Sequence, residues 1–245
     1  MNLLEVQGLR KTYPAFRLED VSFSVPEGAV MGLIGRNGAG KSTTLKSILG
    51  LVHPDAGRVE MFGREFSENE RYIKENIGVV LGGIDFYPKK KVRTITDVTR
   101  RFYSNWQEEK YRHYLDLFAI DENKRVDQLS SGMRVKYLLA LALSHNAQLL
   151  ILDEPTSGLD PVSRDELTEL LRRIAADGTR SVLFSTHITS DLEKCASHIT
   201  FIQEGRLQRS DTLAGFMAHY ADLGSTLEEI IVAAERRPYD ADAII

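Results

Sequence analysis

The sequence predicts an α/β protein in which helices cover a mostly parallel sheet and a helical segment is inserted into the chain. Two observations lead to this prediction. Strand-like and helix-like segments alternate over residues 29–62 and again over residues 148–203, which is the order expected of parallel strands joined by helices. Between them, residues 94–146 carry apolar side chains at three- and four-residue spacing, which is typical of amphipathic helices.

The N-terminal part is predicted to consist mainly of strands that lead to a glycine-rich loop. Polar and apolar residues alternate in two stretches before the apolar run of residues 29–34, which enters the loop directly. Residues 42–49 then form a predicted helix that ends at Gly50, and residues 57–62 form a returning strand. We therefore expect a strand–loop–helix unit here.

The second half of the chain is predicted to continue the same alternation after the helical insertion. Apolar spacing predicts helices over residues 106–118 and 133–143. A short strand and weakly helical segments follow Gly205. The remaining predicted strands are residues 148–152, 180–186 and 198–203, and the remaining predicted helices are residues 162–176 and 190–196.

Composition and charge indicate a globular chain with a sizeable core. The 245 residues are 42% hydrophobic, and 31 basic residues against 35 acidic ones give a net charge of −4. This balance disfavours the broad positive surface of a nucleic-acid-binding protein, so no nucleic-acid partner is expected. The single Cys195 cannot form an internal disulfide, which favours a reducing cytosol. No apolar run approaches the roughly 18 residues of a membrane-spanning helix.

Residues 35–42 read G-R-N-G-A-G-K-S and fit the pattern G-x-x-x-x-G-K-[ST] of a phosphate-binding loop. Glycines let the backbone approach phosphate, and N–H groups at the start of the following helix supply positive potential. Lys41 is expected to reach the β- and γ-phosphates, and Ser42 to offer a ligand to magnesium. The alternative, a tight glycine turn without a ligand, requires the lysine, the serine and both flanking elements to coincide.

Two carboxylates follow the apolar strand that ends at Leu152. Asp153 and Glu154 should lie at the carboxyl edge of a parallel sheet, where ligands gather. Asp153 is expected to hold magnesium through water, and Glu154 to orient or deprotonate the water that attacks the γ-phosphate. A solvated acidic turn before Pro155 is a plausible alternative for the pair alone, but a weak one beside the phosphate-binding loop.

Together with these motifs, residues 129–133 (L-S-S-G-M), residues 153–161 (D-E-P-T-S-G-L-D-P) and His187 make residues 3–210 resemble the nucleotide-binding subunit of an ABC transporter. The resemblance extends to ATPase subunits of ABC-2 type exporters, including the subgroup that handles antimicrobial peptides. It implies one ABC ATPase domain with a P-loop NTPase core, an N-terminal antiparallel β subdomain and an inserted helical subdomain. The expected division is residues 1–87 and 147–210 for the core with its β subdomain, 88–146 for the helical subdomain with the signature motif, and 211–245 for a short C-terminal extension.

The resemblance also assigns roles to single residues. Tyr13 is expected to stack on adenine, although Phe16 is a competing aromatic. Ser130 and Gly132 would reach the γ-phosphate held by an opposite subunit, and Asp160 lies in the segment that communicates between the two sites. Glu154 and His187 are the expected catalytic residues, with His187 sensing the γ-phosphate. The expected ATP-binding residues are Tyr13, Gly35, Asn37, Gly38, Ala39, Gly40, Lys41, Ser42, Thr43, Ser130, Gly132 and Asp160, and the expected Mg²⁺ ligands are Ser42 and Asp153.

Two departures from the family pattern bear on these roles. Gly82 occupies the position of a usual glutamine, so no side chain there can reach magnesium or the attacking water, and hydrolysis could be slower or differently coupled. In the signature, Ser131 replaces a glycine and Met133 replaces a glutamine, which could alter contacts across a dimer while preserving Ser130 and Gly132.

The resemblance predicts an ATP-driven motor that acts with partners. These are a second copy or a paralogous ATPase subunit and a separate transmembrane permease subunit, which would hold the chain at the cytoplasmic face of the cell membrane. Residues 84–88 would receive a short helix from the permease, although packing within the helical lobe explains them equally well. The basic residues 89–93 and 100–101 could meet acidic lipid, but a solvated surface is the simpler interpretation. Two other functions remain open, a soluble ABC ATPase acting on ribosomes or DNA and a nucleotide sensor without turnover.

Overall fold

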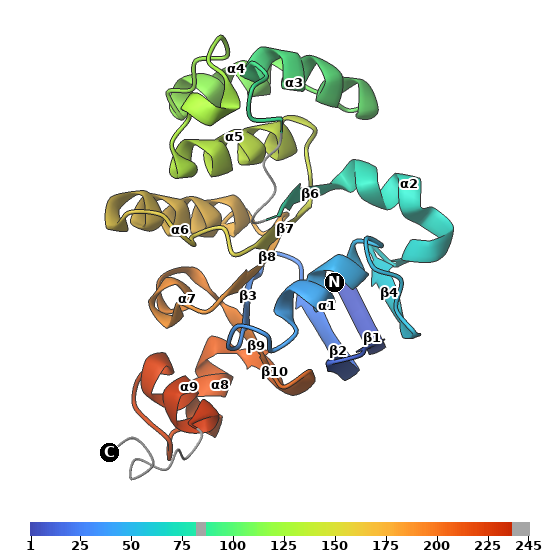
Figure 1. Ribbon diagram of the computed structural model, residues 1–245, viewed down its shortest axis with the longest axis vertical. Helices are drawn as coiled ribbons and strands as arrows, with labels where there is room; N and C mark the ends of the chain where they lie inside the picture. The colour runs from blue at the N-terminus through green and yellow to red at the C-terminus, as the bar shows by residue number, and fades with distance from the viewer. Residues whose placement is uncertain (82–86, 237–245) are drawn as a thin grey trace.

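The structure, a computed structural model, describes residues 1–81 and 87–236 and has the alternating α/β order that the sequence predicts (Figure 1). The strands are β1 (Asn2–Tyr13), β2 (Phe16–Pro26), β3 (Val30–Ile34), β4 (Ala56–Met61), β5 (Arg64–Glu65), β6 (Ile77–Val80), β7 (Leu149–Asp153), β8 (Ser181–Thr186), β9 (His198–Gln203) and β10 (Arg206–Thr212). The helices are α1 (Lys41–Ile48), α2 (Phe66–Asn76), α3 (Val92–Thr99), α4 (Glu108–Leu117), α5 (Ser131–Ser144), α6 (Pro161–Ala175), α7 (Thr189–Cys195), α8 (Leu213–His219) and α9 (Leu227–Glu235), with short 3-10 turns η1 (Arg100–Phe102) and η2 (Val126–Gln128).

The described strands form one sheet with a parallel and an antiparallel part. Strand β3 pairs in parallel with β8 and β9, β8 with β7, and β7 with β6. Strands β1, β2, β4 and β5 pair in antiparallel fashion. Strand β10 joins the two parts, since it is antiparallel to β9 and meets β2 through the pair Arg206 and Glu19. The α/β class is confirmed. The order of the strands places the antiparallel part at one end of the sheet and the parallel part at the other.

Both faces of the parallel part are buried, and alternate side chains feed two different cores. In β7, Leu150 and Leu152 join a core with residues of α6, α7 and α9, whereas Leu149 and Ile151 join a core with α1 and the antiparallel strands. Figure 1 shows α6 and α7 on one side of the sheet and α1 on the other. This explains why the strand is a continuous apolar run, because side chains alternate between faces and both faces are covered.

Helices α3, α4 and α5 form a separate lobe at one end of the molecule (Figure 1), with a hydrophobic core of their own. Its buried hydroxyl groups satisfy one another: the Thr96 hydroxyl lies 2.7 Å from that of Tyr111 and 2.9 Å from that of Tyr137. Burial raises the pKa of Tyr111 to about 12. Among residues 1–81 and 87–236, no helix combines the length and apolarity needed to span a bilayer.

Helix α2 and strands β5 and β6 are elements that the sequence analysis did not predict. The single side chain of α2 that is classed as buried is Ile73, so the segment lacks the repeated apolar spacing that marks the other helices. The helices that were predicted begin and end within a few residues of the observed ones, which is the usual uncertainty of helix ends.

Candidate nucleotide-binding site

The candidate site lies at the carboxyl edge of the parallel strands. Ile34 at the end of β3 pairs with Thr186 at the end of β8, and Asp153 at the end of β7 pairs with Ser185. Since parallel strands end at the same edge, the loop after β3 and the groups after β7 and β8 converge there. The segments that the sequence analysis singled out are therefore brought together by the register of three strands.

The phosphate-binding loop needs glycine at two points where another chain segment approaches. A Cβ at Gly35 would lie 2.1 Å from the carbonyl oxygen of Ile202, and one at Gly40 would lie 2.9 Å from the Phe16 ring. Gly40 also has φ 115°, in the region that favours glycine. It begins α1 with no side-chain cap, so the first N–H groups of the helix are left for a ligand such as phosphate.

Lys41 is held within this loop by acceptor groups. Its side chain is 5% exposed, and its ammonium group donates to the carbonyl oxygens of Gly35 at 2.7 Å and Arg36 at 3.3 Å. It also lies 3.3 Å from Oε1 of Glu154. A buried cation needs such partners to offset its desolvation. The predicted loop lysine and the second predicted carboxylate thus belong to one site.

Ser42 and Asp153 fit the requirements of a magnesium ion. The Ser42 hydroxyl lies 3.1 Å from Oδ1 of Asp153, which also accepts a hydrogen bond from Ser185 at 2.6 Å. Oxygen donors suit Mg²⁺, which usually takes one or two protein ligands and keeps water and phosphate oxygens for the rest. In the described part of the chain no group of three or more His, Cys, Asp or Glu residues could hold a metal ion.

Glu154 and His187 are in contact. Oε2 of Glu154 lies 2.9 Å from Nδ1 of His187, and the Glu154 backbone N–H donates to the Ser185 hydroxyl at 2.9 Å. Glu154 has φ 49°, in the left-handed region. Such a conformation costs of order 1–3 kcal/mol in a residue other than glycine and is concentrated at functional sites. The backbone turns here so that both carboxylates leave β7 toward the loop.

A cavity of about 680 Å³ opens between these groups and the end of the first hairpin. Tyr13, 38% exposed, and Phe16 both line it, so the choice between them for adenine stacking stays a prediction. The cavity is large enough for a nucleotide-sized ligand. Its described lining is completed by Ala15, Arg36, Asn37, Gly38, Gly40, Lys41, Ser42, Thr43, Glu154, Ser157 and His187.

Six predicted residues lie outside the described lining of this cavity: Gly35, Ala39 and Asp153, which belong to the loop and strand beside it, and Ser130, Gly132 and Asp160, which lie at the starts of two helices. Ser130 caps α5 by accepting a hydrogen bond from the N–H of Met133 at 3.2 Å, and Gly132 faces Ser163, whose Cβ would be 3.2 Å from an added Cβ. Asp160 caps α6, and its hydrogen bond with the Ser163 side chain lowers its pKa. The predicted role of these three helix-start residues at the nucleotide of an opposite subunit therefore stays a prediction.

The structure adds Ser185 to the site. It does not describe the position of Gly82. Ser185 ties Asp153 to the Glu154 backbone, and its signal was a hydroxyl at the end of the apolar run of β8. Gly82 and residues 84–86 lie outside the described residues, so the effect of the missing glutamine and the partner-binding role of that segment stay predictions. Tyr87, just after them, is 66% exposed.

Comparison with known proteins gives a family match and several relatives. The family model described as ABC transporter matches residues 18–157. The chain is 32% identical over 208 residues to the bacitracin transport ATP-binding protein of Bacillus licheniformis, covering 84% of this chain and 68% of that one. It is 39% identical over 191 residues to the Nod factor export ATP-binding protein I of Burkholderia orbicola, covering 76% of this chain but 62% of that relative's length.

Solved structures give the same result at the level of the fold. A structure described as an ATP binding subunit of an ABC transporter superposes with a TM-score of 0.84 at 28% identity, covering 96% of this chain and 100% of the other. An ATP-binding cassette solved as a dimer with ADP and Pi has a TM-score of 0.75 at 21% identity, covering 86% of this chain and 98% of that one, and supports the fold alone.

Proposed function

The chain belongs to the ABC transporter family and is an ATP-binding, ATP-hydrolysing subunit, and we propose that its hydrolysis powers export through a separate membrane-spanning permease. The contact of Lys41 and His187 with the two carboxylate oxygens of Glu154 supports the hydrolytic part of this proposal, because it joins phosphate binding and water activation in one cavity. The names of the relatives, which refer to bacitracin transport and Nod factor export, support the export direction.

In the proposed reaction, water attacks the γ-phosphorus and the bond to the β,γ-bridging oxygen breaks. Glu154 orients this water and accepts its proton, while the Lys41 ammonium and the loop N–H groups stabilise negative charge on the phosphate oxygens. His187, at 2.9 Å from Glu154, holds that carboxylate toward the cavity. Ser42 and Asp153 would hold Mg²⁺, which would supply positive charge to neutralise the β- and γ-phosphates.

We further propose that two copies, or one copy and a paralogous subunit, sandwich ATP between them. Ser130 and Gly132 lie at the start of α5 and outside the described lining of the cavity. A serine hydroxyl and free N–H groups at a helix start suit a phosphate, so we assign them to the nucleotide of the opposite subunit. The division into residues 1–87 and 147–210 (core), 88–146 (helical subdomain) and 211–245 (extension) is part of this proposal, as is a position at the cytoplasmic face of the membrane.

Replacing Glu154 tests the proposed mechanism. Glu154→Gln keeps the shape of the side chain but cannot accept the proton, so we expect phosphate release to fall by about a hundredfold or more. ATP should still bind, so an ATP-dependent dimer should accumulate and elute earlier in gel filtration. Glu169→Gln, which removes a surface carboxylate paired with Arg172, is the matched control and should do neither. Unchanged turnover in Glu154→Gln would contradict the assignment.

The proposed partner is tested separately from the chemistry. The tagged chain should co-purify from detergent-solubilised membranes with a protein that has several membrane-spanning helices. Recovery with ribosomes or DNA instead would favour the soluble ABC ATPase, the rival function. That rival finds no support in the net charge of −4 or in relatives named for transport and export.

A further inference from the structure

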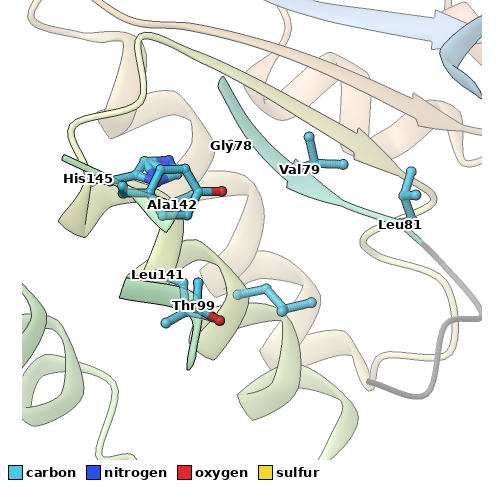
Figure 2. A pocket seen from close by; sticks show the side chains of 9 residues that line it. Gly78, Val79, Leu81, Thr99, Leu141, Ala142 and His145 are labelled. Carbon is cyan, nitrogen blue, oxygen red and sulfur yellow. The ribbon is translucent and has the colours of Figure 1, made fainter. Parts of the chain in front are cut away.

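A second cavity lies between strand β6 and helix α5, at the base of the helical lobe and apart from the residues of the nucleotide site (Figure 2). Its volume is about 260 Å³. Figure 2 shows Val79 and Leu81 of the β6 segment on one side and Ala142 and His145 on the other. The lining is mainly apolar, which by itself indicates no particular ligand.

His145 gives this cavity its chemistry. The side chain is 2% exposed, and neither of its ring nitrogens has a hydrogen-bond partner among the described residues. Several other described residues have one buried polar atom without a partner, but His145 alone has two. Its ring contacts that of Tyr103 at a tilt of 45°, with the ring centroids 3.7 Å apart, so the described contact of the imidazole is with an aromatic ring rather than with a hydrogen-bonding group.

Three buried hydroxyl groups of the same lobe are satisfied, whereas both ring nitrogens of His145 and the side-chain oxygen of Asn105 are not. The hydroxyls of Thr96, Tyr111 and Tyr137 form a hydrogen-bonded set, and Tyr137 also donates to the carbonyl oxygen of Val92. An unsatisfied buried polar group destabilises the folded state, so two such nitrogens on one buried ring call for an explanation. A ligand that hydrogen-bonds to the ring is one.

The imidazole offers a neutral donor and acceptor. Burial lowers the pKa of His145 to about 4, so at neutral pH the ring carries one N–H and one bare nitrogen. A charged ligand would find no counter-ion in this lining, whereas a neutral one would find apolar walls and one hydrogen-bonding group. Since an apolar cavity of about 150 Å³ can hold benzene, a cavity of about 260 Å³ suits a molecule of one or two rings.

We propose that the cavity between β6 and α5 is a binding site for a small, neutral, mostly apolar molecule that carries one hydrogen-bonding group, which His145 receives. Water is a weaker occupant, because a water molecule needs two to four polar partners and the lining is mainly apolar. Displacing poorly ordered water by an apolar body favours binding. The site is independent of ATP hydrolysis.

Indole and indene test the proposal, because they share a shape but only indole has an N–H. With the full ¹⁵N-labelled chain and no nucleotide, we expect indole to shift the His145 ring nitrogens and the amides of Gly78, Val79 and Ala142. Indole should bind about two- to tenfold more tightly than indene, the ratio that one neutral hydrogen bond supplies. Equal affinities, or shifts confined to other residues, would overturn the proposal.

Two variants locate the site. His145→Phe removes the nitrogens but keeps a flat ring, so it should abolish the preference for indole. Val79→Trp should block the mouth and weaken both probes severalfold, whereas Val98→Trp, at a residue 53% exposed outside the lining, should weaken neither. If His145→Phe fails to fold, the affinities of Val79→Trp and Val98→Trp for the two probes still show whether the probes bind in this cavity. ATP binding by each variant reports separately on the nucleotide site, so failure of one proposal is distinguishable from failure of the other.

Discussion

The nucleotide site and the β6–α5 cavity each bury a basic side chain, but only the first surrounds it with hydrogen-bonding partners. Lys41, 5% exposed, touches two carbonyl oxygens and a carboxylate. His145, 2% exposed, touches an aromatic ring and no described polar group. The first environment supports a charge that can meet phosphate, and the second keeps a ring neutral. Burial alone does not decide whether a basic group is charged or neutral. The polar groups that contact it also contribute.

The largest expected effect removes the charge that the first environment supports. Lys41→Met retains the length of the side chain but leaves the phosphates and Glu154 without their cation. Hydrogen bonds to charged groups contribute about 1.5–3 kcal/mol each, so ATP affinity should fall by roughly a hundredfold. Titration with a fluorescent ATP analogue in the presence of Mg²⁺ measures it. Lys46→Met, at an exposed position of the same helix, is the control and should bind ATP normally. Equal affinity in Lys41→Met would show that Lys41 does not reach the nucleotide.

The second effect is a dependence of the free energy of unfolding on pH, which arises from His145 in the β6–α5 cavity. The pKa of His145 falls from its ordinary value of 6.5 to about 4 in the folded chain. Between these values the unfolded state binds more protons, so the free energy of unfolding decreases as pH falls from 6.5 toward 4 and is unaffected by this group above 6.5. The part of this difference that is lost between pH 6.5 and pH 5 corresponds to about 2 kcal/mol.

Urea unfolding at pH 7.5 and pH 5 measures this loss of stability. Other groups also titrate in this range, including His198, whose pKa burial lowers. The comparison is therefore the wild type against His145→Phe. The variant should lose less stability on acidification, and an identical pH dependence in both proteins would show that His145 is not held neutral.

The third effect is on stability at neutral pH. His145→Phe replaces an unpaired imidazole by an apolar ring that can pack on Tyr103, so it should raise the free energy of unfolding by about 1 kcal/mol and the melting temperature by about 2–4 °C. Differential scanning calorimetry measures both. His113→Phe, at an exposed position of the same lobe, should produce no such rise. A fall in stability would mean that the ring nitrogens have partners in solution, such as ordered water.

This comparison also shows which parts of the molecule could be predicted from sequence. The phosphate loop was predictable because its pattern is local, with glycines, Lys41 and Ser42 between one strand and one helix. The contact of Glu154 with His187 joins residues 33 apart in the chain, and the resemblance to a family placed both residues in the site. The parallel sheet followed from the alternation of elements, since β7 is apolar at both faces.

The β6–α5 cavity could not be predicted in this way. His145 ends an apolar helix and is indistinguishable in sequence from a helix-terminal histidine exposed to water. Its burial depends on Tyr103 and on β6, which approach it from two other segments. The same holds for Ser185, whose partner Asp153 is 32 residues away. Contacts set by packing between distant segments have no local pattern.

The smallest expected effect concerns a third buried polar group, which links the C-terminal helix to the phosphate loop. The Glu235 carboxylate accepts a hydrogen bond from the Arg36 backbone N–H at 3.1 Å and lies 3.6 Å from the Arg36 guanidinium. Glu235→Gln keeps an acceptor for the N–H but removes the ion pair, in which the Arg36 side chain is 65% exposed. An ion pair with one exposed partner contributes little, so we expect a loss of about 0.5 kcal/mol.

Thermal unfolding measures this difference, which should amount to about 1–2 °C, and Glu228→Gln at an exposed position of the same helix is the control. Glu235→Ala should cost more than Glu235→Gln, because it removes a described acceptor of the loop N–H as well as the charge. If the two substitutions at Glu235 are equally mild, the hydrogen bond to Arg36 does not stabilise the loop. If Glu235→Ala also weakens ATP binding while Glu228→Gln does not, the C-terminal helix contributes to the conformation in which the loop receives phosphate.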